Sequence, residues 1–119
     1  TYTNVEEEVY EYLSESINKA EAAGIKQIIA DVGIGFGKNL HHNLTLIRNL
    51  TKFKSLGYPI LLGLSRKSFM DKIYPTPMNE RLEGTIAANS IGIVNGANII
   101  RVHDVLENKR ASRIADKLK

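Results

Sequence analysis

Apolar residues recur three or four positions apart in the first part of the chain, as on one face of a helix. The positions concerned are Val5, Val9, Leu13, Ile17 and Ala20. Thr3 and Glu6 have the spacing of a capping box, in which each side chain bonds to the backbone of the other residue. The pattern therefore predicts a helix that begins just after Thr3 and ends before Gly24.

The rest of the chain alternates short apolar runs with helical patterns. The runs, which suit buried strands, are KQIIAD at 26–31, YPILLGL at 58–64 and ANIIRVH at 97–103. The helical patterns cover about 43–56, about 79–95 and the residues after Asp104, which is the expected N-cap. Gly57 and Gly96 follow the first two of these helices and predict their ends.

Strands that are apolar on both faces and joined by helices are typical of a parallel sheet. The strand–helix repeat of about 35 residues fits the βα unit of a (β/α)₈ barrel and also a small doubly wound sheet. We favour the C-terminal part, about three βα units, of a (β/α)₈ TIM barrel, because the chain starts with a helix that no strand precedes. Residues 1–119 would then form a single, incomplete domain.

Composition narrows the class of protein mainly by exclusion. A hydrophobic fraction of 43% is that of a globular chain and excludes disorder. No apolar run has the length of a membrane span, and the N-terminus is acidic where a signal peptide would be basic. The absence of cysteine excludes disulfides and thiolate metal sites. We expect a cytoplasmic protein without a membrane partner.

The net charge of +3 is divided unevenly along the chain. Residues 1–21 hold six glutamates against Lys19 alone, so the surplus of positive charge lies in the remainder. Several of these basic residues are spread along helix faces, which favours a small anionic ligand over nucleic acid.

Polar residues collect where the three expected strands end. They are Asp31 with the loop GIGFGK, Gly63 with Ser65-Arg66-Lys67-Ser68, and the pair Arg101 and His103. In both candidate architectures, ligands bind at these carboxyl ends. The glycine loop matches neither nucleotide fingerprint. Lys38 stands where a dinucleotide fold needs glycine, and Gly33 is too close to Gly37 for a P-loop.

Each of these groups has a structural and a functional interpretation. Asp31 either caps a turn or accepts adjacent N–H donors of a flat heterocycle, which the glycines would admit. Residues 65–68 form either a solvated loop or an anion site. Arg101 and His103 share one strand face, which favours a phosphate clamp over a structural pair. Outside these groups, His41-His42 suits a helix cap rather than a metal site, and residues 81 and 83 suit an exposed first turn.

The motifs DVGIGFGKN, GLSRKS and RVHDV, in this order, resemble those of the dihydropteroate synthase family of the folate pathway. The resemblance covers essentially the whole chain, as the C-terminal part of such an enzyme. It implies a transferase that joins 6-hydroxymethyl-7,8-dihydropterin diphosphate to 4-aminobenzoate and is a sulfonamide target. One departure is Val32, where the family usually has proline.

The resemblance also implies roles for individual residues. Asp31 would hold the pterin N–H edge, Gly35 and Gly63 would leave room for its ring, and Lys67 would touch its carbonyl. The other substrate contacts would come from Phe36, Lys38, Arg66, Ser68, Arg101 and His103, of which the last two would grip the diphosphate. The catalytic residues would be Lys67, Arg101 and His103. Mg²⁺ would bind through the diphosphate and an asparagine outside this chain, so no metal ligand is expected here.

Two further expectations and two alternative functions complete the prediction. The 119 residues alone would be inactive, and they would form a homodimer or self-associate. One alternative is a methyltetrahydrofolate-binding methyltransferase domain, which shares the aspartate and the barrel but has no use for the SRKS and RVH groups. The other is a non-catalytic flavodoxin-like module that binds anions.

Overall fold

The computed structural model describes all residues from 1 to 119. Its elements are α1 (Val5–Ala22), β1 (Ala30–Asp31), α2 (Leu40–Arg48), the 3₁₀ helix η1 (Leu50–Leu56), β2 (Ile60–Leu62), the 3₁₀ helix η2 (Met78–Glu80), α3 (Leu82–Val94), β3 (Ile99–Ile100) and α4 (Val105–Leu118). No helix combines the length and the apolar character needed to cross a membrane. The alternation of strands with helices agrees with the prediction, although the hydrogen-bonded strands are shorter than the apolar runs.

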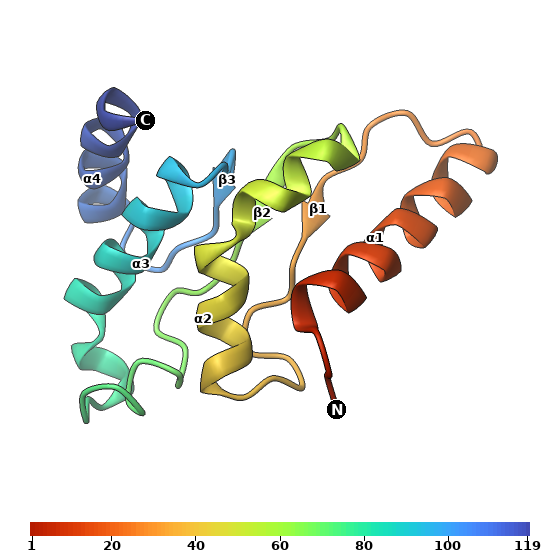
Figure 1. Ribbon diagram of the computed structural model, residues 1–119. Helices are drawn as coiled ribbons and strands as arrows, with labels where there is room; N and C mark the ends of the chain where they lie inside the picture. Colours follow the sequence, from red (N-terminus) through yellow and green to blue (C-terminus); the bar gives the residue numbers. More distant parts are fainter.

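The three strands form one parallel sheet in the order β1-β2-β3 (Figure 1). Asp31 lies opposite Leu61, which in turn lies opposite Ile99. The order along the sheet is the order along the chain, so each crossover moves in the same direction. Since such crossovers are right-handed, all the helices fall on one face of the sheet.

The helices indeed form a single layer. Each helix contacts the next, from α1 through α2 and α3 to α4, and Figure 1 shows them in this order across the molecule. The molecule is correspondingly flat, with extents of 43 × 33 × 22 Å. A doubly wound sheet has helices on both faces, so this arrangement excludes the flavodoxin-like alternative.

Alternation along the strands separates core residues from exposed ones. Val32 and Leu62 point toward the helices and are at most 2% exposed. They join a cluster that also contains Ile34, Leu46, Leu50, Phe53, Ile60 and Leu64. Asp31, Gly63 and Arg101 have the opposite parity, so they belong to the face that the helices leave uncovered. The predicted site residues on the strands therefore share one face.

The predicted capping box of the first helix was wrong. The N-cap of α1 is Asn4, one residue later than Thr3, and its side chain accepts a hydrogen bond from the Glu7 backbone. Glu8 instead of Glu6 reaches back, accepting from the backbone N–H groups of residues 3 and 4. The predicted helix over 43–56 is α2 followed by η1, and that over 79–95 is η2 followed by α3. Gly24, Gly57 and Gly96, all with positive φ, lie at helix ends as predicted.

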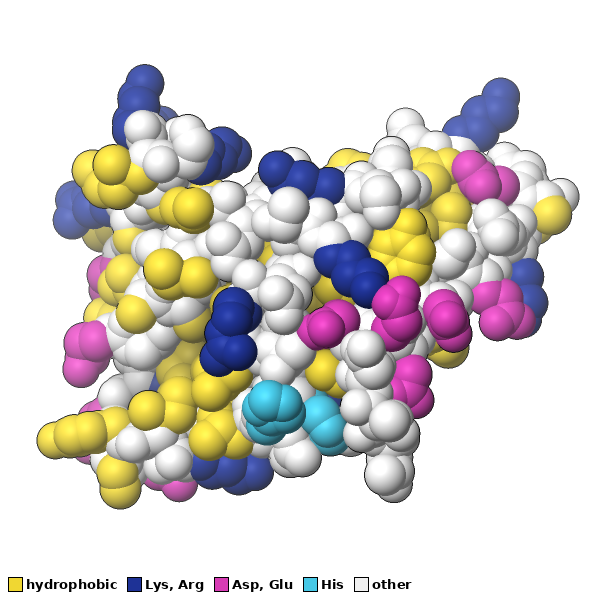
Figure 2. All heavy atoms as spheres, viewed as in Figure 1, with side chains coloured by type: hydrophobic (Ala, Val, Ile, Leu, Met, Phe, Trp, Pro, Cys, Tyr) yellow, Lys and Arg dark blue, Asp and Glu magenta, His cyan; other side chains and the backbone are white.

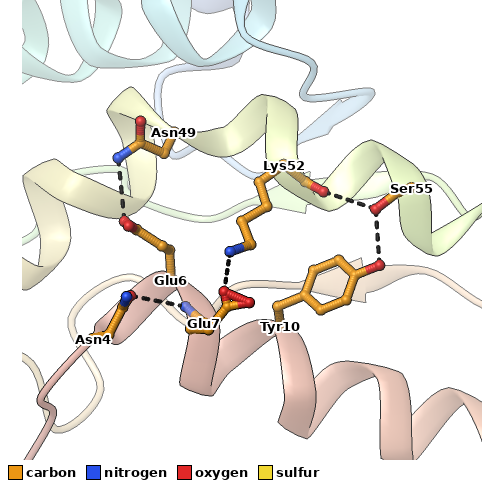
Figure 3. Close-up of polar contacts among 7 residues, drawn as sticks. All are labelled: Asn4, Glu6, Glu7, Tyr10, Asn49, Lys52 and Ser55. Atoms are coloured by element: carbon orange, nitrogen blue, oxygen red, sulfur yellow. Dashed lines mark hydrogen bonds and ion pairs between the residues drawn. The ribbon is translucent and has the colours of Figure 1, made fainter.

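The acidic side chains gathered over α1 contact the next helical segment (Figure 2). Glu7 forms an ion pair with Lys52, and Glu6 accepts a hydrogen bond from the Asn49 amide at 3.2 Å (Figure 3). The Tyr10 hydroxyl lies 2.8 Å from that of Ser55. Two of the six glutamates in residues 1–21, Glu6 and Glu7, thus bind α1 to the helical segment formed by α2 and η1.

Gly92 allows α3 to approach the sheet closely. A Cβ atom at this position would lie 2.3 Å from Cδ2 of Leu62, whose side chain is fully buried. We expect Gly92→Ala to lower the free energy of unfolding by about 2 kcal/mol, because overpacking a filled core forces neighbours out of place. Equilibrium urea denaturation measures this loss.

Gly84→Ala is the matched control in the same helix. Its Cβ would meet the Met70 sulfur at 2.9 Å, and a flexible methionine can move aside. Equal losses from the two substitutions would contradict the close packing of α3 on β2.

Candidate active site at the carboxyl ends of the strands

The loop after β1 is held in a fixed shape by side chains. The Asp31 carboxylate accepts a hydrogen bond from the Gly33 backbone at 2.9 Å, and the Gly35 backbone donates to the Asn43 side chain at 2.8 Å. Gly33, Gly35 and Gly37 all have positive φ, which only glycine adopts easily. Val32, at the position of the family's proline, is buried in the core. Packing and the Asp31 side chain therefore fix this turn.

Two lysines meet at the same loop. The Lys67 amino group, which comes from the loop after β2, donates to the Ile34 carbonyl at 2.6 Å and lies 4.4 Å from the centre of the Phe36 ring. Lys38 donates to the Gly33 and Phe36 carbonyls at 2.8 and 3.0 Å. The stem of Lys67 passes 3.2 Å from the place of a Cβ on Gly35. In this structure, the room that Gly35 provides is taken by Lys67.

The ammonium groups of these lysines are partly removed from water. Burial lowers the pKa of Lys67, the positive charge of Arg101 lowers it further, and Asp31 opposes both effects. Burial likewise lowers the pKa of Lys38, with Asp31 opposing and Lys67 adding to the shift. The groups of all three strand ends are therefore close enough to influence one another's charge.

The lowered pKa of Lys67, caused mainly by burial, gives a pH dependence of stability. In the unfolded chain a lysine has its ordinary pKa of 10.5. Between the lowered pKa and 10.5, the unfolded state binds more protons than the folded state, so stability rises with pH in that interval. Measured against a Lys67→Met variant, the chain is expected to gain stability as the pH approaches 10.5 from below.

Two substitutions are expected to move the Lys67 pKa in opposite directions. Arg101→Gln removes a repelling charge and raises it, whereas Asp31→Asn removes an attracting charge and lowers it. NMR titration of the Lys67 side chain measures both shifts. Shifts of the same sign, or none, would show that these groups do not meet.

Arg101 lies directly over Gly63. A Cβ on Gly63 would be 2.7 Å from Nη2 of Arg101, so glycine is needed for this contact, and again a cation fills the room. The guanidinium forms no hydrogen bond or ion pair within the chain. It lines a hollow of about 120 Å³ with residues Gly63, Ser65, Lys67, Val102 and His103. The strand ends after β2 and β3 thus present Lys67, Arg101 and His103 together.

Arg66 has a different environment from its neighbours. It is the one non-glycine residue with positive φ, 59°. Its guanidinium pairs with the Asp104 carboxylate at 3.0 Å, and its backbone N–H donates to Thr85 at 3.1 Å. Asp104 is the N-cap residue of α4, as predicted, but its side chain makes no capping bond. The pair joins the loop after β2 to the start of α4, outside the hollow over Gly63.

Arg81 was predicted to lie in an exposed first turn, and this was wrong. It is half-buried, and its guanidinium donates to the carbonyls of Arg66 and Thr76 at 2.8 and 3.1 Å. Glu83 is exposed as expected. Arg81 therefore helps to hold the strained backbone of Arg66, which sets the direction of Lys67.

Other predicted residues lie at the margin of this cluster. Phe36 is exposed beneath Lys67, and Ser68 is exposed without a hydrogen bond of its side chain. His42 caps α2: its Nδ1 accepts from the Asn39 backbone at 3.3 Å. No group of three His, Cys, Asp or Glu side chains is placed to hold a metal ion.

Sequence reasoning did not identify Asn43 as part of the site, and it named Ser65 only as a member of the SRKS group, without its partner. Asn43 reads as one more residue of a helix, and nothing in its spacing indicates a bond to Gly35. Ser65 stood within the SRKS group, but its contact with His103 depends on the pairing of β2 with β3.

The largest hollow lies away from these residues. It measures about 570 Å³ and lies on the outer face between α2, α3 and the segment after β2. Figure 2 shows apolar side chains gathered on this part of the molecule. Three of the apolar side chains that line the hollow, those of Ile73, Tyr74 and Ile91, are more than half exposed. None of the predicted site residues lines it.

The chain is similar to known proteins in family, sequence and structure. Residues 1–103 match the model of the family described as pterin binding enzyme. The dihydropteroate synthase of Clostridium beijerinckii is 50% identical over an alignment of 118 positions, which covers 97% of this chain and 44% of that protein. The chain thus spans less than half the length of the curated relatives that it matches first.

Solved structures of dihydropteroate synthases are also similar to this chain over nearly its whole length. The dihydropteroate synthase of Clostridium difficile, crystallised in the presence of pteroic acid, has a TM-score of 0.94 and 44% identity over 99% of this chain and 46% of its own. That of Thermus thermophilus, in complex with 4-aminobenzoate, has a TM-score of 0.94 and 36% identity over all of this chain and 47% of its own. The predicted fold, part of a (β/α)₈ barrel, is confirmed. The chain belongs to the family of pterin binding enzymes, and the relatives that it resembles there are dihydropteroate synthases.

Proposed function

We propose that these residues form one side of the active site of a dihydropteroate synthase of folate biosynthesis. In this reaction the amino nitrogen of 4-aminobenzoate bonds to the pterin methylene carbon. The bond from that carbon to the diphosphate oxygen breaks, diphosphate leaves with the electron pair, and the nitrogen loses a proton. The observation that supports the proposal most is that Lys67 contacts the loop after Asp31 and shares one hollow with Arg101, so that groups from three strand ends come together.

Asp31 is the proposed receptor for the pterin. A carboxylate has two acceptor oxygens, and the pterin edge presents neighbouring N–H donors to match them. Only one Asp31 oxygen is used by the loop, where it accepts from Gly33. Lys67 would release the Ile34 carbonyl and donate to the pterin carbonyl. Gly35 and Gly63 would give room to the ring as Lys67 and Arg101 turn to the substrate.

Arg101 and His103 are the proposed diphosphate ligands. Negative charge grows on the leaving diphosphate as the carbon–oxygen bond breaks, and donors already in place stabilise it without rearrangement. The Arg101 guanidinium has no partner in the chain, so all its donors are available. Lys67 adds a second positive charge on the same hollow.

The proposed 4-aminobenzoate contacts are Phe36, Lys67 and Ser68. Phe36 is exposed beside Lys67 and offers a flat apolar surface to a benzene ring. The free hydroxyl of Ser68 would bind the carboxylate. An aromatic amine is neutral near pH 7, so its attack needs no strong base. Lys38 supports the loop beside this pocket, and Arg66 acts through its pair with Asp104.

Mg²⁺ remains part of the proposal through the family resemblance alone. This chain offers no group of acidic or histidine side chains that fits a metal ion, so no step is derived through it. Its ligands would be the diphosphate and residues outside this chain.

An exchange of matched segments tests the proposed function. In a chimera, this chain replaces the matching segment of the C. beijerinckii enzyme, with which it is 50% identical. We expect turnover of pterin diphosphate and 4-aminobenzoate within tenfold of the parent enzyme. Circular dichroism establishes folding, and a folded chimera without turnover would contradict the proposal. The 119 residues alone are expected to show no turnover.

We also expect the isolated chain to self-associate. β1 and β3 each have one unpaired edge, and Ile29 and Ile99 are exposed beside them. Apolar strand edges pair readily with other copies. Sedimentation velocity measures the state, and a monomer at all concentrations would contradict this expectation.

A further inference from the structure

Ser65 and His103 form a closed pair of hydrogen bonds. Ser65 lies three residues after the end of β2, is 7% exposed, and lies 38 residues before His103 in the sequence. The His103 backbone N–H donates to the Ser65 hydroxyl oxygen at 3.1 Å, and that oxygen lies 2.8 Å from Nδ1 of the same histidine. One hydroxyl thus holds both the backbone and the ring of His103.

The proton positions in this pair follow from counting donors. A hydroxyl has one proton to donate and two lone pairs to accept with, and a backbone N–H can only donate. No other group accepts from the Ser65 hydroxyl in the structure. If Nδ1 carried a proton, the hydroxyl proton would have no acceptor at a nearly buried position, which is costly. The hydroxyl therefore donates to Nδ1.

This direction decides which nitrogen of the neutral ring carries the proton. With Nδ1 as acceptor, the proton is on Nε2. Nε2 has no hydrogen-bond partner in the chain, and His103 lines the hollow that Lys67 and Arg101 share. The ring then donates into the hollow without adding a third positive charge between two cations. A bare Nε2 there would repel the oxygens of an anion.

We propose that Ser65 is a positioning residue that holds neutral His103 in its Nε2–H tautomer, as a donor to the diphosphate bound beside Arg101. The identity of the anion rests on the proposed function, whereas the tautomer does not. Neither Arg101 nor Lys67 contacts this hydroxyl, so Ser65 acts on the site through His103 alone.

The tautomer is measured directly from the ¹⁵N shifts of the ring nitrogens. The spectra are recorded on the full chain at about pH 9, well above the usual histidine pKa of about 6.5. His103→Gln assigns the signals. We expect Nδ1 of His103 to have the shift of an unprotonated nitrogen in the parent. Ser65→Ala is expected to give a mixture of tautomers, and Ser65→Thr, which keeps the hydroxyl, the parent pattern.

Internal and matched controls distinguish this from a general structural effect. His42 Nδ1 accepts from the Asn39 backbone, so its tautomer is expected to remain unchanged in every variant. Ser90→Ala is the matched control for Ser65→Ala, because it removes a hydroxyl that bonds only within α3, to the Ile86 carbonyl. If Ser65→Ala does not fold, Ser65→Gly gives the same test, because it also removes the hydroxyl. A protonated Nδ1 in the parent, or unchanged shifts in the variant that lacks the hydroxyl, would overturn the proposal.

Titration with inorganic diphosphate tests the donor role. We expect Ser65→Ala to weaken binding about 3- to 10-fold, the effect of one misplaced hydrogen bond, and Ser65→Thr to restore it. A shifted tautomer with parent-like affinity would overturn the donor role. Absence of diphosphate binding in the parent, with the tautomer as expected, would refute the proposed anion and leave the effect of Ser65 on His103 intact.

Discussion

Asp31→Asn is expected to weaken binding of the pterin diphosphate to the chimera by roughly 100-fold, which corresponds to about 3 kcal/mol. Asparagine replaces one of the two acceptor oxygens by an NH₂ donor, which would face the N–H donors of the pterin. It also removes the negative charge that strengthens both bonds. Isothermal titration calorimetry measures the loss.

Asparagine is the suitable replacement because it can still hold the loop. Its side-chain oxygen can accept from Gly33 as the carboxylate does, so the turn after β1 is expected to keep its shape. Asp116→Asn, on α4 and paired only with Lys119, is the matched control. Equal affinities for Asp31→Asn and the parent would remove Asp31 from the pterin site.

Arg101→Gln is expected to lower kcat/KM of the chimera roughly 100-fold. Removing one donor that stabilises charge in a transition state typically costs about 100- to 1,000-fold, and Lys67 and His103 retain part of the effect. The Arg101 guanidinium bonds to no other group of the chain, so its loss is expected to leave stability nearly unchanged. Steady-state kinetics and urea denaturation together check this result.

Arg113→Gln, an exposed change on α4, is the control for the loss of one positive charge. A loss of stability as large as the loss of activity would mean that Arg101 is structural. Asp31→Asn and Arg101→Gln are also expected to differ in which ligands they weaken. Asp31→Asn is expected to weaken pterins with or without diphosphate, and Arg101→Gln only those that carry it.

The sequence was sufficient to predict the sheet and the face of the sheet on which the candidate residues lie. Val32 and Leu62 fall in or beside apolar runs of strand length, and glycines at 24, 57 and 96 mark the helix ends. Arg101 and His103 are two residues apart in an extended segment, so strand alternation alone puts them on one face. These features depend on local pattern and strand parity, and both are properties of the sequence itself.

The features that the sequence did not reveal depend on contacts between distant segments. The positive φ of Arg66 is held by Thr85, Arg81 and Asp104, none of which is its neighbour in the chain. Asp104 has the type and position of a capping residue, but its side chain forms an ion pair with Arg66, which lies in another loop. For the same reason, Gly35 and Gly63 were expected to face a ligand, and the structure places Lys67 and Arg101 against them.

The most direct test of the central claim, that pterin and diphosphate sites meet at these strand ends, compares three ligands by calorimetry. They are the hydroxymethyl pterin, inorganic diphosphate and the pterin diphosphate, each titrated into the chimera. If the two sites adjoin, the joined ligand is expected to bind at least about 100-fold more tightly than the better of its two parts, because the second contact becomes intramolecular. A joined ligand that binds no better than its tighter part would contradict the account.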